Sequence, residues 1–93
     1  MKITSDDKIK RNTEINFSYI DDEAVMLNIK HSQYIGLDSI GTIIWNKLDK
    51  TMKIENIILE LTNEYSVSYD DCKSDTLDFI ENMLEKELII VTK

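Results

Sequence analysis

Residues 33–48, QYIGLDSIGTIIWNKL, decide the fold of this chain. The first five of them predict a short strand. Asp38 then favours the start of a helix, because its carboxylate can accept the free N–H groups of a first turn. Apolar residues recur on one face of this helix, at Ile40, Ile44, Trp45 and Leu48. Trp45 is the only tryptophan, and we expect it to anchor the core together with Leu37 and Leu48.

Two alternating runs precede this stretch, at residues 14–20 and 23–30, and period-two alternation is typical of strands. One face of the first run carries Ile15, Phe17 and Tyr19, and one face of the second carries Val25, Leu27 and Ile29. With residues 33–37 they predict a three-stranded antiparallel meander. Residues 1–12 are polar and of mixed charge, and we expect them to be loosely held, with Ile9 as their one contact.

Helical periodicity dominates the rest of the chain. Residues 39–48 predict the first helix, residues 52–65 the second, and residues from 69 to about 87 the third. The second helix carries an apolar stripe formed by Ile54, Ile57, Ile58, Leu61 and Tyr65. Ser68 and Asp71 fit a capping box at the start of the third helix. Residues 88–91 predict a short strand or an extended tail. Strands followed by three helices give an α+β fold of one domain, residues 1–93.

Composition limits the classes of function. The formal net charge of −7 disfavours binding to nucleic acid through its phosphates and favours a basic or neutral partner. Cys72 is the only cysteine, so no internal disulfide is expected. No apolar run approaches the roughly 18 residues of a membrane span, and no signal-peptide core opens the sequence, so we expect a cytoplasmic protein.

The residue types that carry catalysis are sparse. His31 is the only histidine and lies in a predicted turn, about forty residues before Cys72. One histidine and one cysteine cannot complete a tetrahedral zinc site, and no glycine-rich phosphate loop is present. We therefore expect no enzyme activity, no cofactor and no metal, with His31 a solvated turn residue.

Two features instead suggest binding. Residues 70–87 include seven acidic residues but only two basic ones. One flank of this helix is formed by Asp71, Asp75, Asp78 and Asn82. That flank is either a solvated surface or the wall of a groove for a basic segment. The third strand is either a protected edge or a site where an extended peptide adds a strand.

The order of these residues resembles the PqqD-like family of leader-peptide-binding proteins, also called RiPP recognition elements. The resemblance covers residues 14–90 and rests on the run from Tyr34 to Asp38, then Gly41, Ile44-Trp45 and Leu48-Asp49, the helix with Ile57, Leu61 and Tyr65, and finally Asp75, Phe79 and Leu88-Ile89. Two positions depart from the family pattern. Glu87 replaces a glycine at the end of the last helix, so a left-handed cap there would be absent or strained, and Lys53 replaces a threonine cap.

The resemblance implies a winged helix-turn-helix that binds a leader peptide as an added strand, between the third strand and the third helix. The implied contacts are Gln33, Tyr34, Ile35 and Gly36 on the strand, and Asp71, Asp75, Asp78, Phe79 and Asn82 on the helix. For Phe79 the sequence leaves two assignments open, a place in the core or a place in the groove. A free-standing chain with this IWxxL pattern most resembles the small leader-binding subunit of lasso peptide systems, which implies a precursor leader and a separate leader peptidase or other modifying enzyme as partners. The alternative is an acidic winged-helix regulator that binds DNA or a protein.

Overall fold

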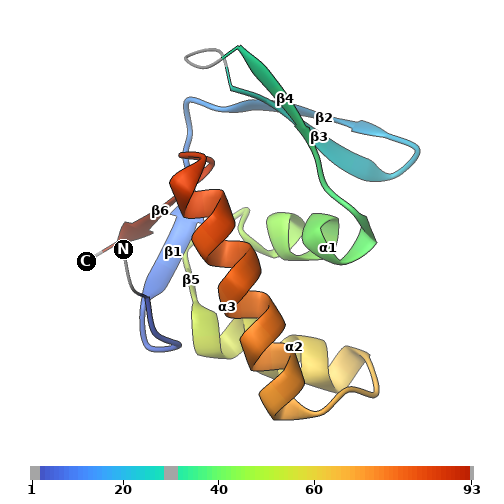
Figure 1. Cartoon of the computed structure of the whole chain (residues 1–93), viewed down its shortest axis with the longest axis vertical. Coiled ribbons are helices and arrows are strands. Elements are labelled where there is room, and N and C mark those ends of the chain that lie inside the picture. The colour runs from blue at the N-terminus through green and yellow to red at the C-terminus, as the bar shows by residue number, and fades with distance from the viewer. Residues whose placement is uncertain (1–2, 29–31, 93) are drawn as a thin grey trace.

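The computed structural model describes residues 3–28 and 32–92 and contains two small sheets and three helices (Figure 1). The strands are β1 (Lys8–Arg11), β2 (Asn16–Ile20), β3 (Glu23–Asn28), β4 (Gln33–Gly36), β5 (Met52–Lys53) and β6 (Ile89–Thr92). The helices are α1 (Ser39–Lys47), α2 (Ile54–Glu64) and α3 (Tyr69–Glu85). The predicted α+β class and its three helices are confirmed. No helix in the described ranges is long and apolar enough to cross a membrane.

The predicted meander is present as an antiparallel sheet of order β2-β3-β4. Its inner face, which packs on α1, carries Ala24 and Met26, which are fully buried, while Val25 and Leu27 on the other face are only half-buried. The Ala24 N–H donates to Thr42 Oγ1 of α1 at 2.9 Å. Such a close helix–sheet approach leaves little room for a larger side chain at position 24.

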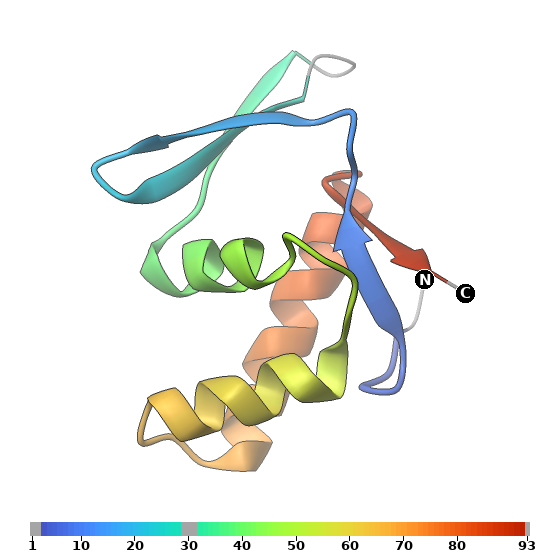
Figure 2. The same ribbon diagram turned by 180° about the vertical axis from the view of Figure 1, so that it is seen from behind.

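A second antiparallel sheet, of order β5-β1-β6, corrects one expectation and decides an alternative that the sequence left open. Residues 1–12 are not a loosely held segment throughout, because β1 pairs on both sides and Ile3 and Ile9 are buried in the core. The closing run of the chain is a strand, β6. Figure 2 shows β1 and β6 side by side, on the viewer's side of α3. The sequence does not reveal β1, because Ile9 is its single apolar residue among three basic ones and no alternating pattern marks it.

The same N-terminal segment caps α2. Lys53 occupies the N-cap position and makes no side-chain capping bond. Instead, the Ile54 N–H donates to the Asp7 carbonyl at 2.9 Å, and the Glu55 N–H donates to the Ser5 carbonyl at 2.8 Å. Backbone carbonyls far away in the sequence thus satisfy the free donors of the first turn, which a threonine hydroxyl would otherwise serve.

The other helix ends follow the sequence closely. Asp38 caps α1 by accepting the Gly41 N–H at 2.7 Å, and Ser68 caps α3 by accepting the Asp71 N–H at 3.2 Å. At the end of α3, Glu87 has a left-handed backbone with φ of 61°. The left-handed cap is therefore present without glycine: the Leu88 N–H donates to the Met83 carbonyl and the Glu87 N–H to the Leu84 carbonyl, both at 3.0 Å.

The core confirms the predicted anchors and corrects two positions. Trp45, Leu37 and Leu48 are all buried. Ile40 and Tyr65, which the helical periodicity placed on buried faces, are 46% and 38% exposed. Ile40 lies in the first turn of α1, and Tyr65 lies just beyond the last residue of α2. At helix ends the periodicity no longer determines what the neighbouring elements cover.

Candidate functional site

The outer edge of β4 pairs with no strand in the described ranges, because β4 is the last strand of the sheet β2-β3-β4. The register pairs Ile35 with Met26, and the next N–H toward β3 is that of Leu37, which donates to the Ala24 carbonyl at 2.9 Å. Peptide groups alternate in direction along an antiparallel strand. The N–H and C=O groups of Tyr34 and Gly36 therefore point away from β3, toward the free edge.

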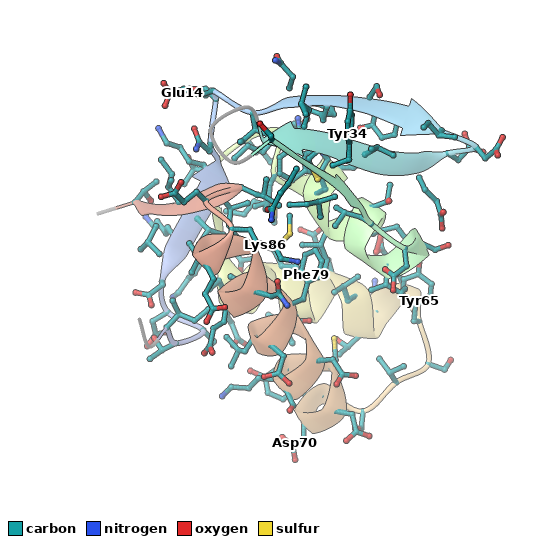
Figure 3. All side chains as sticks on the ribbon, turned by 45° about the horizontal axis from the view of Figure 1, so that its top comes forward. Glu14, Tyr34, Tyr65, Asp70, Phe79 and Lys86 are labelled. Atoms are coloured by element: carbon teal, nitrogen blue, oxygen red, sulfur yellow. The ribbon has the colours of Figure 1, made fainter. Side chains whose placement is uncertain are left out.

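Both residues leave that edge accessible. The Tyr34 side chain is 77% exposed on the outer face of the sheet (Figure 3). A Cβ at Gly36 would meet no atom within 4 Å, and its backbone is not in the left-handed region. The fold itself does not require glycine at this position.

A groove of about 870 Å³ begins where β4 ends. It lies between α1, α3 and the connection from α2 to α3. Its residues are Asp38, Ile40, Gly41, Ile44, Leu61, Tyr65, Ser66, Val67, Ser68, Asp71, Cys72, Ser74, Asp75, Thr76 and Phe79. Ile44, Leu61, Cys72 and Thr76 are buried and form its floor.

The groove contains three of the predicted contacts, Asp71, Asp75 and Phe79. Phe79 belongs to both alternatives that the sequence left open: it is half-buried, it packs against the core and it lines the groove. Its Cε1 would lie 2.9 Å from a Cβ at Gly41, so the ring sits directly against the first turn of α1 (Figure 3). Glycine at 41 is what permits this approach.

The remaining predicted contacts lie outside the groove. Gln33, Tyr34, Ile35 and Gly36 form β4 itself. Asp78 and Asn82 are exposed on α3, beyond the groove lining. The structure thus divides the predicted set into an edge strand, a groove wall and an exposed stretch of α3.

Three residues of the groove rim were missed as candidate contacts. Ile40, Tyr65 and Val67 are exposed apolar side chains from α1, the end of α2 and the α2–α3 connection. Ile40 and Tyr65 were assigned to the core stripes of their helices. The sequence contains one signal for this rim, which is Val67. It is an apolar residue between two serines in the connection after the second helix, and a fully solvated loop would not need an apolar residue there.

Polar contacts hold the helices around the groove. Lys47 of α1 pairs with Glu60 of α2 at 2.9 Å and with Glu64 at 3.1 Å. Burial alone would lower the pKa of Lys47, but the two carboxylates outweigh it and raise the pKa. The Tyr69 hydroxyl of α3 donates to Glu55 of α2 at 2.6 Å, and this hydrogen bond raises the pKa of Tyr69.

A second, smaller hollow of about 380 Å³ surrounds Arg11 and Trp45 and has a structural explanation. The Arg11 Nη2 donates to the Trp45 carbonyl at 2.7 Å near the end of α1. Its guanidinium carbon lies 4.8 Å from the ring centroids of both Phe17 and Trp45. A cation favours the C-terminal carbonyls of a helix and the faces of aromatic rings. Arg11 therefore joins β1, β2 and α1.

The two residues considered for catalysis are His31 and Cys72. His31 lies outside the described residues. Cys72 is buried, with its Sγ 3.8 Å from the Ile58 carbonyl. Residues 3–28 and 32–92 contain no group of three or more potential metal ligands.

Comparisons with known proteins agree with this architecture. The family model of coenzyme PQQ synthesis protein D (PqqD) matches residues 23–89. The structure of TbiB1 in complex with the TbiA(beta) leader peptide superposes with a TM-score of 0.79 and 34% sequence identity, over 86% of this chain and 93% of that one. A comparison with curated proteins found no match. Because the family model covers most of the chain, from β3 to β6, this protein belongs to the PqqD family.

Proposed function

We propose that this protein binds the leader region of a ribosomally synthesised precursor peptide as an additional strand on β4, facing α3. The observation that carries the proposal is the free edge of β4, where Tyr34 and Gly36 direct their N–H and C=O groups outward. An extended peptide can satisfy such groups with main-chain hydrogen bonds. Gly36 lets the peptide lie close, since no side chain stands beside the backbone there.

Membership of the PqqD family and the likeness to TbiB1, which was solved with a leader peptide, support this proposal. The proposed contacts are Gln33, Tyr34, Ile35, Gly36, Asp71, Asp75, Asp78, Phe79 and Asn82. Within β4, Tyr34 and Gly36 supply the strand hydrogen bonds, whereas Gln33 and Ile35 direct theirs to β3 and maintain the edge.

Binding without catalysis is the role we assign to this chain. It would deliver the leader to separate modifying enzymes in the cytoplasm, where precursors are made, with a lasso leader peptidase and a cyclase as the favoured partners. On this proposal α1–α3 and the β2–β3 hairpin act as a winged helix-turn-helix that binds peptide. Binding to DNA is not favoured, because α3 has Asp70 and Asp71 in its first turn and carries further acidic residues where a recognition helix would meet phosphates.

The edge-strand proposal is tested by Tyr34→Pro, which removes one outward N–H. Proline is tolerated on an edge strand when the lost donor faces outward, so the β3–β4 pairing should persist. We expect this variant to bind the leader half of the precursor encoded beside its gene about tenfold more weakly, from one lost hydrogen bond and the bulk of the ring. Isothermal titration calorimetry measures the affinity.

Tyr34→Val is the matched control, because it alters the same side chain and keeps the N–H. Amide NMR spectra of both variants establish that the fold is retained. Equal affinity of the two folded variants would contradict strand addition along β4.

A further inference from the structure

We infer that the groove between α1, α3 and the α2–α3 connection selects a leader segment in which a bulky apolar residue adjoins a lysine or arginine. This inference rests on the proposed function and adds a second recognition element to it. The strand edge of β4 would take backbone of any sequence, whereas the groove would decide which leader is accepted.

The part of the groove that would bind the apolar residue is formed by side chains that the fold leaves exposed. Ile40, Tyr65 and Val67 are 46%, 38% and 50% exposed, and they surround one opening from three different elements. Beneath them, Ile44 and Leu61 form a buried floor. Scattered exposed apolar residues are ordinary, but a convergent set above an apolar floor is typical of a binding surface.

The negative charge of the groove is the reason for expecting a lysine or arginine beside the apolar residue. Asp71 and Asp75 are exposed on its α3 wall, one helical turn apart, and no lysine or arginine belongs to the lining. Within the described ranges neither carboxylate forms an ion pair. Like charges at this spacing repel each other, and a cation between them would relieve the repulsion. Asp38 adds a third carboxylate, already engaged as the cap of α1.

The groove is continuous with the β4 edge. Gly36 ends the strand, the Leu37 N–H returns to the Ala24 carbonyl, and Asp38 is already part of the groove lining. An extended peptide advances about 3.3 Å per residue. A peptide paired with Tyr34 and Gly36 therefore reaches the groove within its next few residues, passing Phe79 against Gly41. We place the apolar and cationic side chains in that part of the leader.

The test selects peptides from a random displayed library on the wild-type protein and on Asp75→Asn. Wild type should enrich lysine or arginine within a few residues of leucine, isoleucine or an aromatic residue, and Asp75→Asn should lose the enrichment in cations. A peptide selected on wild type should bind Asp75→Asn about twofold to fivefold more weakly at low salt, the range of an exposed ion pair. The difference should shrink at high salt.

Asp70→Asn is the matched control, because it removes the same charge from the same helix, next to Asp71 but outside the groove lining. Asp70→Asn should bind the selected peptide like wild type. If it weakens binding as much as Asp75→Asn, net charge rather than the groove is responsible, and the inference is overturned. Selected peptides that lose affinity on Tyr34→Pro but show no preference for cations would also overturn it, while leaving strand addition intact. If wild type selects no peptide, both fail.

Discussion

Glu87 shows how a single residue can hold a conformation that its side chain disfavours. The chain must reverse after α3 so that β6 can pair with β1, and the left-handed backbone at position 87, φ 61°, provides this reversal. A residue with a Cβ loses roughly 1 kcal/mol or more in that conformation relative to glycine. The two hydrogen bonds of the cap and the fully buried Leu88 that follows it hold the conformation in place.

Replacing Glu87 with glycine should relieve this backbone strain. We expect the free energy of unfolding of Glu87→Gly to exceed that of Glu87→Ala by about 1 kcal/mol. Urea denaturation followed by the fluorescence of Trp45 gives both values. Alanine is the appropriate reference, because it removes the same side-chain contacts and retains the Cβ. A glycine variant no more stable than the alanine variant would show that the cap carries no strain.

The residues of β4 could be predicted from the sequence, whereas those of the groove rim could not. The pattern of residues 33–37 was enough to predict the strand, and its place as the last strand of the meander made it an edge, while the sequence left open whether that edge is free. Which N–H groups face outward depends on the register with β3, in which Tyr34 lies opposite Leu27 and Gly36 opposite Val25, and no local sequence pattern gives that register. The groove rim was not predictable from periodicity, because Ile40 and Tyr65 continue apolar stripes past the point where a neighbouring element covers them.

The N-terminal segment is the element that sequence reasoning misjudged most. Each of its strand pairings is short, and β6 lies some eighty residues away along the chain, so no local pattern marks the sheet β5-β1-β6. The capping of α2 by the Asp7 and Ser5 carbonyls is likewise invisible in the sequence, since any residue can supply a carbonyl. The helices were predictable because their buried stripes and side-chain caps are local.

Removing residues 1–7 should measure what this segment contributes. The deletion takes away both carbonyl caps of α2 and the buried side chain of Ile3. We expect the free energy of unfolding to fall by about 3 kcal/mol, from two capping bonds near 1 kcal/mol each and one partly compensated apolar burial. Ser5→Ala keeps the carbonyl and should change stability by less than about 0.5 kcal/mol. A deletion as mild as Ser5→Ala would rule out backbone capping.

At the scale of the whole molecule, the sheet β2-β3-β4 rests on the helices mainly through α1. Phe17 packs edge-on against Trp45 with ring centroids 5.2 Å apart, the Tyr19 hydroxyl hydrogen-bonds Asn46, and Ala24 bonds Thr42. A peptide that pairs with β4 and also contacts α3 would add a second connection between the sheet and the helices.

Ligand binding should therefore stabilise the entire chain. With leader peptide at a hundred times its dissociation constant, the free energy of unfolding should rise by about 2.7 kcal/mol. Hydrogen exchange should slow both in β4 and in α3, because one ligand connects them. Tyr34→Pro at the same peptide concentration should show a smaller rise. Protection confined to α3 would indicate that the peptide does not use the strand edge.

The pairing of Lys8 with Thr92 brings the two ends of the described chain to one edge of the molecule, remote from β4 (Figure 1). Because its two ends lie close together, the protein has the geometry of a domain that can be inserted into another chain. The chain could be inserted into a surface loop of a larger enzyme through two short linkers, with the outer edge of β4 left unobstructed. The sheet β5-β1-β6 would then hold the two ends of the domain together, both in a free-standing chain and in such an insertion.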